Sequence, residues 1–332
     1  MKGFSPLVMG VILAGRAGAG TQSAGQDFGD EMRMVMTARQ AASGGVAIED
    51  PWRQGTFIEA TTIVLASGMR WLGFGAQAGA GTDWRLGAEA FAFSPGDIAG
   101  TRELQDGTFG GETGNIRAVS WGASMVSQWT LVQTDAWRVA TLARAIGLVQ
   151  QLPNENNAGV AIAGGLQAQR VTGSGAALTA WGYLGPLGSG AGRTFAGRFT
   201  LGAGWMAQMS AGLLGGPEGL GLGAEGDILT EALVQEGAGA VYWFGRLGDP
   251  GGTLFVRLGL KHAPASAQSI QPRAGLGLLW RLPSGLGLQF DYALSTLGEL
   301  GLVHYATIGL RLAPSQPVSR IIQERAVVDE GE

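Results

Sequence analysis

Strict two-residue alternation in the C-terminal part of the chain is the feature that most restricts its fold. In residues 254–261, leucine and valine occupy every even position, and the odd positions hold Phe255, Arg257, Gly259 and Lys261. The same alternation recurs in 275–281, 286–294 and 305–312. Successive strand side chains point to opposite faces, whereas helical side chains share a face every 3.6 residues. The pattern therefore predicts four consecutive β-strands, each with one apolar face.

Composition indicates which face meets which solvent. Charged residues make up 14% of the chain, against about 25% in an average soluble domain. The face opposite the large apolar residues holds mostly small residues and isolated charges, which is too little for a solubilising surface. Transmembrane barrels turn large apolar side chains to lipid and small or polar ones to the lumen. We therefore predict a barrel in the bacterial outer membrane, with a soluble secreted β-protein as the alternative.

Other classes of protein are disfavoured by simple counts. No apolar run reaches the 18 or more residues that a transmembrane helix needs. The absence of cysteine excludes disulfides and thiolate metal sites. The net charge of -4 gives no support for nucleic-acid binding, which shows as a basic excess.

Extending the period-two pattern along the chain predicts an all-β fold, a 14-stranded antiparallel transmembrane β-barrel over residues 61–312. The even count is typical of bacterial barrels, and the connections alternate between short turns and longer loops, as expected for periplasmic turns and extracellular loops. Residues 135–149 also fit a helix. The predicted strands are 61–67, 70–79, 83–94, 117–131, 135–149, 157–169, 175–184, 195–206, 208–220, 238–247, 252–261, 272–281, 284–295 and 303–312.

The two ends of the chain are predicted to lie in the periplasm. Residues 1–20 have the basic start, short apolar core and small residues of a secretory signal peptide. Residues 21–60 include a glycine-free helical stretch at 30–42 and are predicted to fold as a plug into the wide lumen; an unstructured periplasmic tail is the alternative. Residues 313–332 carry Val318, Ile321 and Ile322 in a charged stretch, and we expect this tail to dock on the periplasmic rim or on a partner.

Charged residues that the alternation turns inward are the candidate site. We expect them to act in binding or transport, or to form a structural ion network with the plug. No catalytic residue, metal site or cofactor is predicted. The chain has only two histidines, His262 and His304, which are too few for a clustered metal site. A Ser-His-Asp triad stays open as an alternative, since its members meet only in space. The candidate lumen-facing residues are Arg257, Lys261, Arg281, Asp291 and Arg311.

The closing stretch 287–312 resembles the terminal hairpin of PorV/PorQ-type outer-membrane proteins, which belong to the FadL-like group of 14-stranded barrels. The residues that carry this resemblance are Asp291, Tyr292, Ala293, Leu297, Gly298, Leu300, Gly301 and His304. Residues 37–47 are similar to the N-terminal hatch motif of that group. The Asn-Pro-Ala-Gly element that follows the hatch is absent, and Asp50-Pro51-Trp52 stands near its place.

This resemblance implies a non-enzymatic function: we expect a PorV-like protein-binding or secretion-associated component, with a FadL-like transporter of hydrophobic small molecules as the alternative. PorV-like proteins act with the type IX secretion translocon, which implies a translocon or a secreted cargo protein as partner. FadL-like proteins pass hydrophobic molecules, which implies a hydrophobic ligand in the lumen. In either case outer-membrane lipid is an expected partner, and nucleic acid is not.

Overall fold

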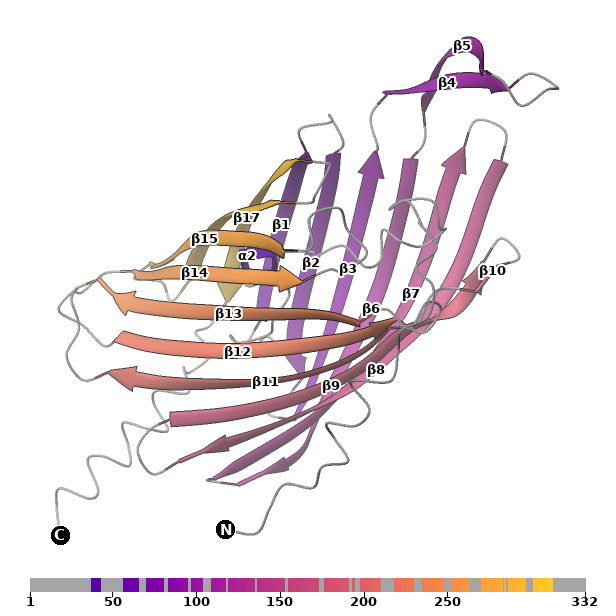
Figure 1. Ribbon diagram of the computed structural model, residues 1–332. Coiled ribbons are helices and arrows are strands. Elements are labelled where there is room, and N and C mark those ends of the chain that lie inside the picture. The colour runs from indigo at the N-terminus through magenta and orange to yellow at the C-terminus, as the bar shows by residue number, and fades with distance from the viewer. Residues whose placement is uncertain are drawn as a thin grey trace, which may run out of the picture.

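The computed structural model describes a closed β-barrel with a short helix inside it and a small hairpin beyond one rim (Figure 1). The predicted signal peptide, most of the predicted plug and the C-terminal tail lie outside the described residues. The ranges not described are 1–36, 43–55, 66–69, 81–82, 95–96, 104–108, 118, 135, 153–154, 173–175, 191–192, 195–197, 210–217, 230–234, 248–251, 263–269, 283, 285, 297–300 and 313–332.

Fourteen long strands, counted over the described part of the chain, pair antiparallel in sequence order, and β1 pairs with β17 to join the two ends of the barrel. The predicted fold class and strand number are confirmed. The strands are β1 (Thr56–Leu65), β2 (Arg70–Ala80), β3 (Trp84–Ser94), β6 (Val119–Gln133), β7 (Trp137–Leu152), β8 (Glu155–Val171), β9 (Ala176–Gly190), β11 (Arg198–Met209), β12 (Glu218–Leu229), β13 (Gln235–Arg246), β14 (Thr253–His262), β15 (Ile270–Arg281), β16 (Gly287–Thr296) and β17 (Leu302–Leu312). A two-residue strand, β10 (Arg193–Thr194), extends the end of β9.

Three sequence predictions about element bounds need correction or completion. The strand predicted at 208–220 is wrong, because the structure has β12 at Glu218–Leu229. The prediction failed at its one-residue turn, Ala207, since reversal between antiparallel strands needs at least two residues. Residues 135–149, which also fitted a helix, lie in strand β7. The predicted loop after β3 contains a separate hairpin of β4 (Asp97–Glu103) and β5 (Phe109–Arg117).

The two faces of the wall differ as the alternation predicts. In β15, Leu276 and Trp280 are exposed, whereas Gly275 and Gly277 on the other face are buried. In a transmembrane barrel the exposed apolar face is the lipid face.

Of the six exposed tryptophans in the described residues, five lie near one rim and Trp121 lies near the other. We call the rim with five tryptophans the terminal end, because β1 begins and β17 ends there, and the opposite rim the hairpin end, because β4 and β5 project beyond it (Figure 1). Aromatic girdles mark the membrane–water interfaces of such barrels. The exposed tryptophans near the terminal end are Trp84, Trp129, Trp137, Trp205 and Trp280.

Helix α2 (Ala38–Ala42) packs against the inner face of β14–β17. Its alanines are buried, and the Ala38 backbone N–H donates to Thr307 Oγ1 at 3.0 Å. A Cβ added at Gly275 would lie 2.5 Å from the Ala42 Cβ, so only glycine lets the helix approach β15 this closely. No helix in the described residues is long and apolar enough to span a membrane.

Candidate functional site

Arg39, from α2, inserts its guanidinium into a polar cluster on the inner wall. Its Nη2 lies 2.7 Å from Glu59 Oε2 on β1, and its Nε lies 3.5 Å from Asp291 Oδ2 on β16. Gln289 accepts from Arg39 Nη1 at 3.3 Å and donates from its Nε2 to Asp291. The helix is therefore tied by one charged side chain to both the first strand of the barrel and one of the last.

Arg257 extends this cluster along the wall. Its Nη1 donates to Asp291 Oδ1 at 3.0 Å, and both side chains are 1% exposed. The guanidinium also lies over the rings of Phe255 and Tyr242, 5.0 and 5.6 Å from their centroids. A cation over an aromatic face gains electrostatic stabilisation, most when it is shielded from water. Gly277 has no side chain, and the Arg257–Asp291 ion pair occupies the space that a Cβ at this position would take.

The candidate charges from the sequence occupy three separate places. Arg257, Asp291 and Arg311 belong to one cluster, in which Arg311 Nε donates to Gln289 Oε1 at 2.7 Å. Lys261 instead pairs with Glu236 Oε2 at 2.8 Å nearer the hairpin end. Arg281 is exposed at the terminal rim.

Sequence reasoning missed Arg39 and Glu59, which complete the cluster. Both fall in the predicted plug, residues 21–60, and the first predicted strand begins only at residue 61. The alternation around it gives the available signal: Phe57, Glu59 and Thr61 share one face, and the smaller or apolar Ile58, Ala60 and Thr62 share the other. Arg39 has no comparable signal, because its partners are distant in sequence.

A second polar group lies on the inner face of β3, β6 and β7. Arg144 pairs with Glu89, and Ser124 Oγ donates to the same Glu89 Oε2 at 3.0 Å. Apolar side chains from the same part of the wall lie toward the hairpin end, where Trp71 stacks with Phe91 and joins a buried cluster with Ile146. The lumen thus has separate polar and apolar regions.

The residues of the terminal-hairpin motif divide between the two faces of the wall. Asp291 points inward, whereas Tyr292 and His304 point outward and are joined by a 2.6 Å hydrogen bond between Tyr292 Oη and His304 Nδ1. Gly301 has a φ of 77°, a conformation that glycine adopts readily and larger residues do not. Gly298 lies outside the described residues.

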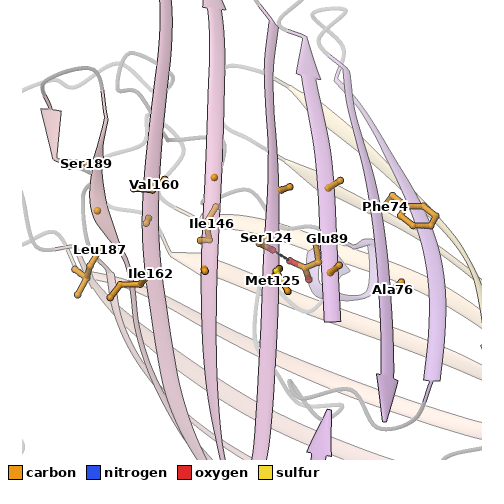
Figure 2. A pocket seen from close by; sticks show the side chains of 17 residues that line it. Phe74, Ala76, Glu89, Ser124, Met125, Ile146, Val160, Ile162, Leu187 and Ser189 are labelled. Atoms are coloured by element: carbon orange, nitrogen blue, oxygen red, sulfur yellow. Dashed lines mark hydrogen bonds between the residues drawn. The ribbon is translucent and has the colours of Figure 1, made fainter. Parts of the chain in front are cut away.

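A concave apolar groove of about 840 Å³ runs across the outer face of β2, β3, β6, β7, β8 and β9. Figure 2 shows Phe74 at one edge and Ile162 and Leu187 at the other, with Met125 between them. Its floor is made of small residues on the outward face of the wall. These are Ala76, Ala88, Ala90, Ala123, Ala145 and Gly147.

The groove ends where the β8–β9 ladder is interrupted. Ile162 pairs with Leu187, but the next pair is Gly164 with Leu184, so one residue of β8 and two of β9 are skipped. The skipped β9 residues are Gly185, whose φ is 132°, and Pro186, which has no backbone N–H to donate. A bulge of this kind leaves residues unpaired and bends the strand.

The described residues hold no group of three or more His, Cys, Asp or Glu placed to bind a metal ion. His304 is hydrogen-bonded to Tyr292 on the outer face, away from the inner carboxylates. The absence of catalytic residues, metals and cofactors stays a prediction.

No protein-family model and no curated protein matches the sequence. The barrel fold is similar to that of solved outer-membrane barrels. The P. putida toluene transporter TodX has a TM-score of 0.50 at 11% identity, over 84% of this chain and 98% of TodX. The Ralstonia pickettii toluene transporter TbuX has a TM-score of 0.45 at 9% identity, over 82% and 96%. CdiB from Acinetobacter baumannii has a TM-score of 0.48 at 10% identity over 77% of this chain, which spans 60% of CdiB.

Proposed function

We propose that this protein is a non-enzymatic transporter of hydrophobic small molecules across the outer membrane. The observation that carries the proposal is the interrupted β8–β9 ladder at the end of an apolar groove on the lipid face. The resemblance to FadL-like barrels and the shared fold with the toluene transporter TodX support the same function.

Apolar surface lies on both sides of the wall near this interruption. Outside it are Ile162 and Leu187, which line the groove, and inside it are Ile146 and Ala161, which belong to the buried apolar cluster. A hydrophobic molecule that leaves the lumen here avoids the cost of entering water. Because residues at the bulge are unpaired, opening the wall here breaks fewer hydrogen bonds than opening a regular ladder.

Helix α2 and the Arg39 cluster have a complementary role in this proposal. They occupy the lumen beside β14–β17 and add a charged cluster to the inner wall there. The helix then acts as a plug against water-soluble molecules, while the apolar route leads sideways through the wall. Both termini lie in the periplasm in this arrangement.

Locking the interruption with a disulfide should stop transport. The chain has no cysteine, and Ile162 and Leu187 are paired and both outward-facing. Paired antiparallel residues have Cα atoms about 4.5–5.5 Å apart, within the range of about 4.4–6.8 Å that a disulfide spans. We expect oxidised I162C/L187C to take up radiolabelled hydrocarbon at the background rate of cells without the protein, and reduction to restore uptake.

The matched control places the same cross-link on an uninterrupted ladder. Leu222 on β12 and Val241 on β13 are likewise paired and exposed. Oxidised L222C/V241C should transport at the wild-type rate. If the two oxidised variants transport equally well, the β8–β9 interruption is not the exit.

A second candidate function, secretion-associated protein binding, is favoured by the β4–β5 hairpin. This two-stranded sheet projects beyond the hairpin end and pairs with no barrel strand (Figure 1). A ribbon with open edges suits strand addition by a partner, whose main chain can pair with it. The PorV resemblance suggests a translocon or secreted cargo as that partner, and the tail at 313–332 remains a proposed second contact.

Deleting the hairpin separates this candidate from transport. Replacing residues 97–117 with a short Gly-Ser linker should leave the barrel folded, because its strand pairing does not involve β4 or β5. We expect the variant to lose partners that co-purify with the wild-type protein from outer membranes, as measured by mass spectrometry. The control replaces the 263–269 connection at the same rim, and equal partner recovery in wild type and deletion variant would exclude the role.

A further inference from the structure

Basic side chains lie on the outer face near both rims of the barrel. Among the barrel residues whose side-chain exposure is described, four arginine or histidine side chains point outward: Arg70, Arg170, His262 and His304. Arg170 is near the terminal end, and the other three are near the hairpin end. Charges on a lipid-facing surface cost least at the headgroup level. These residues lie near the ends of the strands, at the height where the headgroups of a surrounding bilayer are expected.

Two of these residues share one row across the wall. Val64 on β1 pairs with His304 on one side and with Arg70 on the other. Strands lie about 4.8 Å apart, so the two basic residues are about 10 Å apart across Val64. Tyr292 Oη holds His304 Nδ1 at 2.6 Å, which orients the ring and leaves its second nitrogen, Nε2, for another contact.

A lane of small side chains runs from this row toward the middle of the membrane. Thr62 and Ala60 follow Val64 on the outer face of β1. Larger exposed side chains flank them: Leu72 pairs with Thr62, and Phe74 and Ile308 pair with Ala60 from either side. The strip has a ridge of Leu72 and Phe74 on its β2 side, while on its β17 side small Ala306 lies beside Thr62 and Ile308 beside Ala60. A low strip of this shape fits an extended acyl chain.

We propose that the Arg70–Val64–His304 row binds the phosphate of an anionic lipid headgroup, with one acyl chain of that lipid in the Thr62–Ala60 lane. Arginine donates to phosphate in a bidentate manner, and the His304 ring adds a donor on the other side. Basic groups at the membrane surface attract anionic lipids. The site favours a membrane lipid over free phosphate. Only a lipid has both a phosphate for the basic row and an acyl chain for the Thr62–Ala60 lane.

The test measures lipid retained by the purified protein in native mass spectrometry. The probes are phosphatidylglycerol and phosphatidylcholine with identical acyl chains. The wild-type protein should retain more phosphatidylglycerol, and R70Q/H304Q should lose this excess. The matched control R170Q removes an outward-facing arginine near the opposite rim and should retain the excess.

A second variant tests the lane without changing charge. Ala60→Phe fills the strip below the row and should weaken phosphatidylglycerol retention, although Arg70 and His304 remain. Heat-dependent gel mobility verifies that each variant forms the barrel.

Four results would each overturn the proposal. They are equal retention of the two lipids by the wild-type protein, equal losses in R70Q/H304Q and R170Q, undiminished retention in Ala60→Phe, and complete displacement of the lipid by inorganic phosphate at matched concentration. The last result would mean that phosphate alone is recognised. None of these results bears on transport through the wall.

Discussion

Replacing Asp291 with alanine should lower the free energy of unfolding by about 3–5 kcal/mol, the usual cost of breaking a buried ion pair from one side. The carboxylate is 1% exposed and contacts two guanidinium groups, those of Arg257 and Arg39. Its removal leaves both without this counter-charge in a site shielded from water. Denaturant titration in detergent micelles, followed by tryptophan fluorescence, measures the change.

A more exposed ion pair in the same barrel provides the control. Lys261 and Glu236 are 2.8 Å apart, with side chains 20% and 18% exposed. Solvent screening limits such a pair to about 1 kcal/mol or less, so K261Q should be close to wild type. If D291A and K261Q lose similar stability, the cluster around Asp291 does not hold the barrel together.

Replacing Ala42 with phenylalanine should open the lumen to ions. The side chain of Ala42 packs where the wall has no room even for a Cβ on Gly275, so a large ring displaces α2 from β15. The barrel sequence itself is unchanged, and the wall therefore still closes. We expect single-channel conductance in planar bilayers to rise from the wild-type background to that of an open pore.

Gln40 provides the matched control on the same helix. Its side chain is exposed, so Q40F adds the same ring without displacing the helix. This variant should conduct no more than wild type. A42F that conducts like Q40F would show that α2 does not seal the lumen.

Periodicity was sufficient to predict the barrel and the direction of most of its side chains. Arg257 and Asp291 were placed on one face because each sits between apolar neighbours, and the structure pairs them. The same reasoning failed in 208–220, where glycine and leucine fit several registers equally well. Glycine-rich strands carry little information about register, because a one-residue slip changes few side chains of consequence.

The remaining parts of the site depend on contacts between distant segments. The Arg39–Glu59 pair joins a helix to a strand across a stretch that no periodic pattern describes. The outer groove exists because alanines from several strands meet at the same height, which only the register of the closed sheet determines. The interrupted β8–β9 ladder likewise depends on which part of β8 lies opposite Gly185 and Pro186, not on proline alone.

The position of α2 against β14–β17, with Arg39 paired to Glu59 on β1, has a consequence for the order of assembly. This ladder joins residues from opposite ends of the chain, and its closure carries the entropic cost of a very long loop. Ala38 already contacts Thr307, 269 residues away, and Arg39 binds both Glu59 and Asp291. A helix tethered to the first strand and bound to the last ones raises the local concentration of one barrel edge near the other. The N-terminal segment would thus act as an internal template for the pairing of β1 with β17. This role in assembly would precede any role in excluding solutes from the finished lumen.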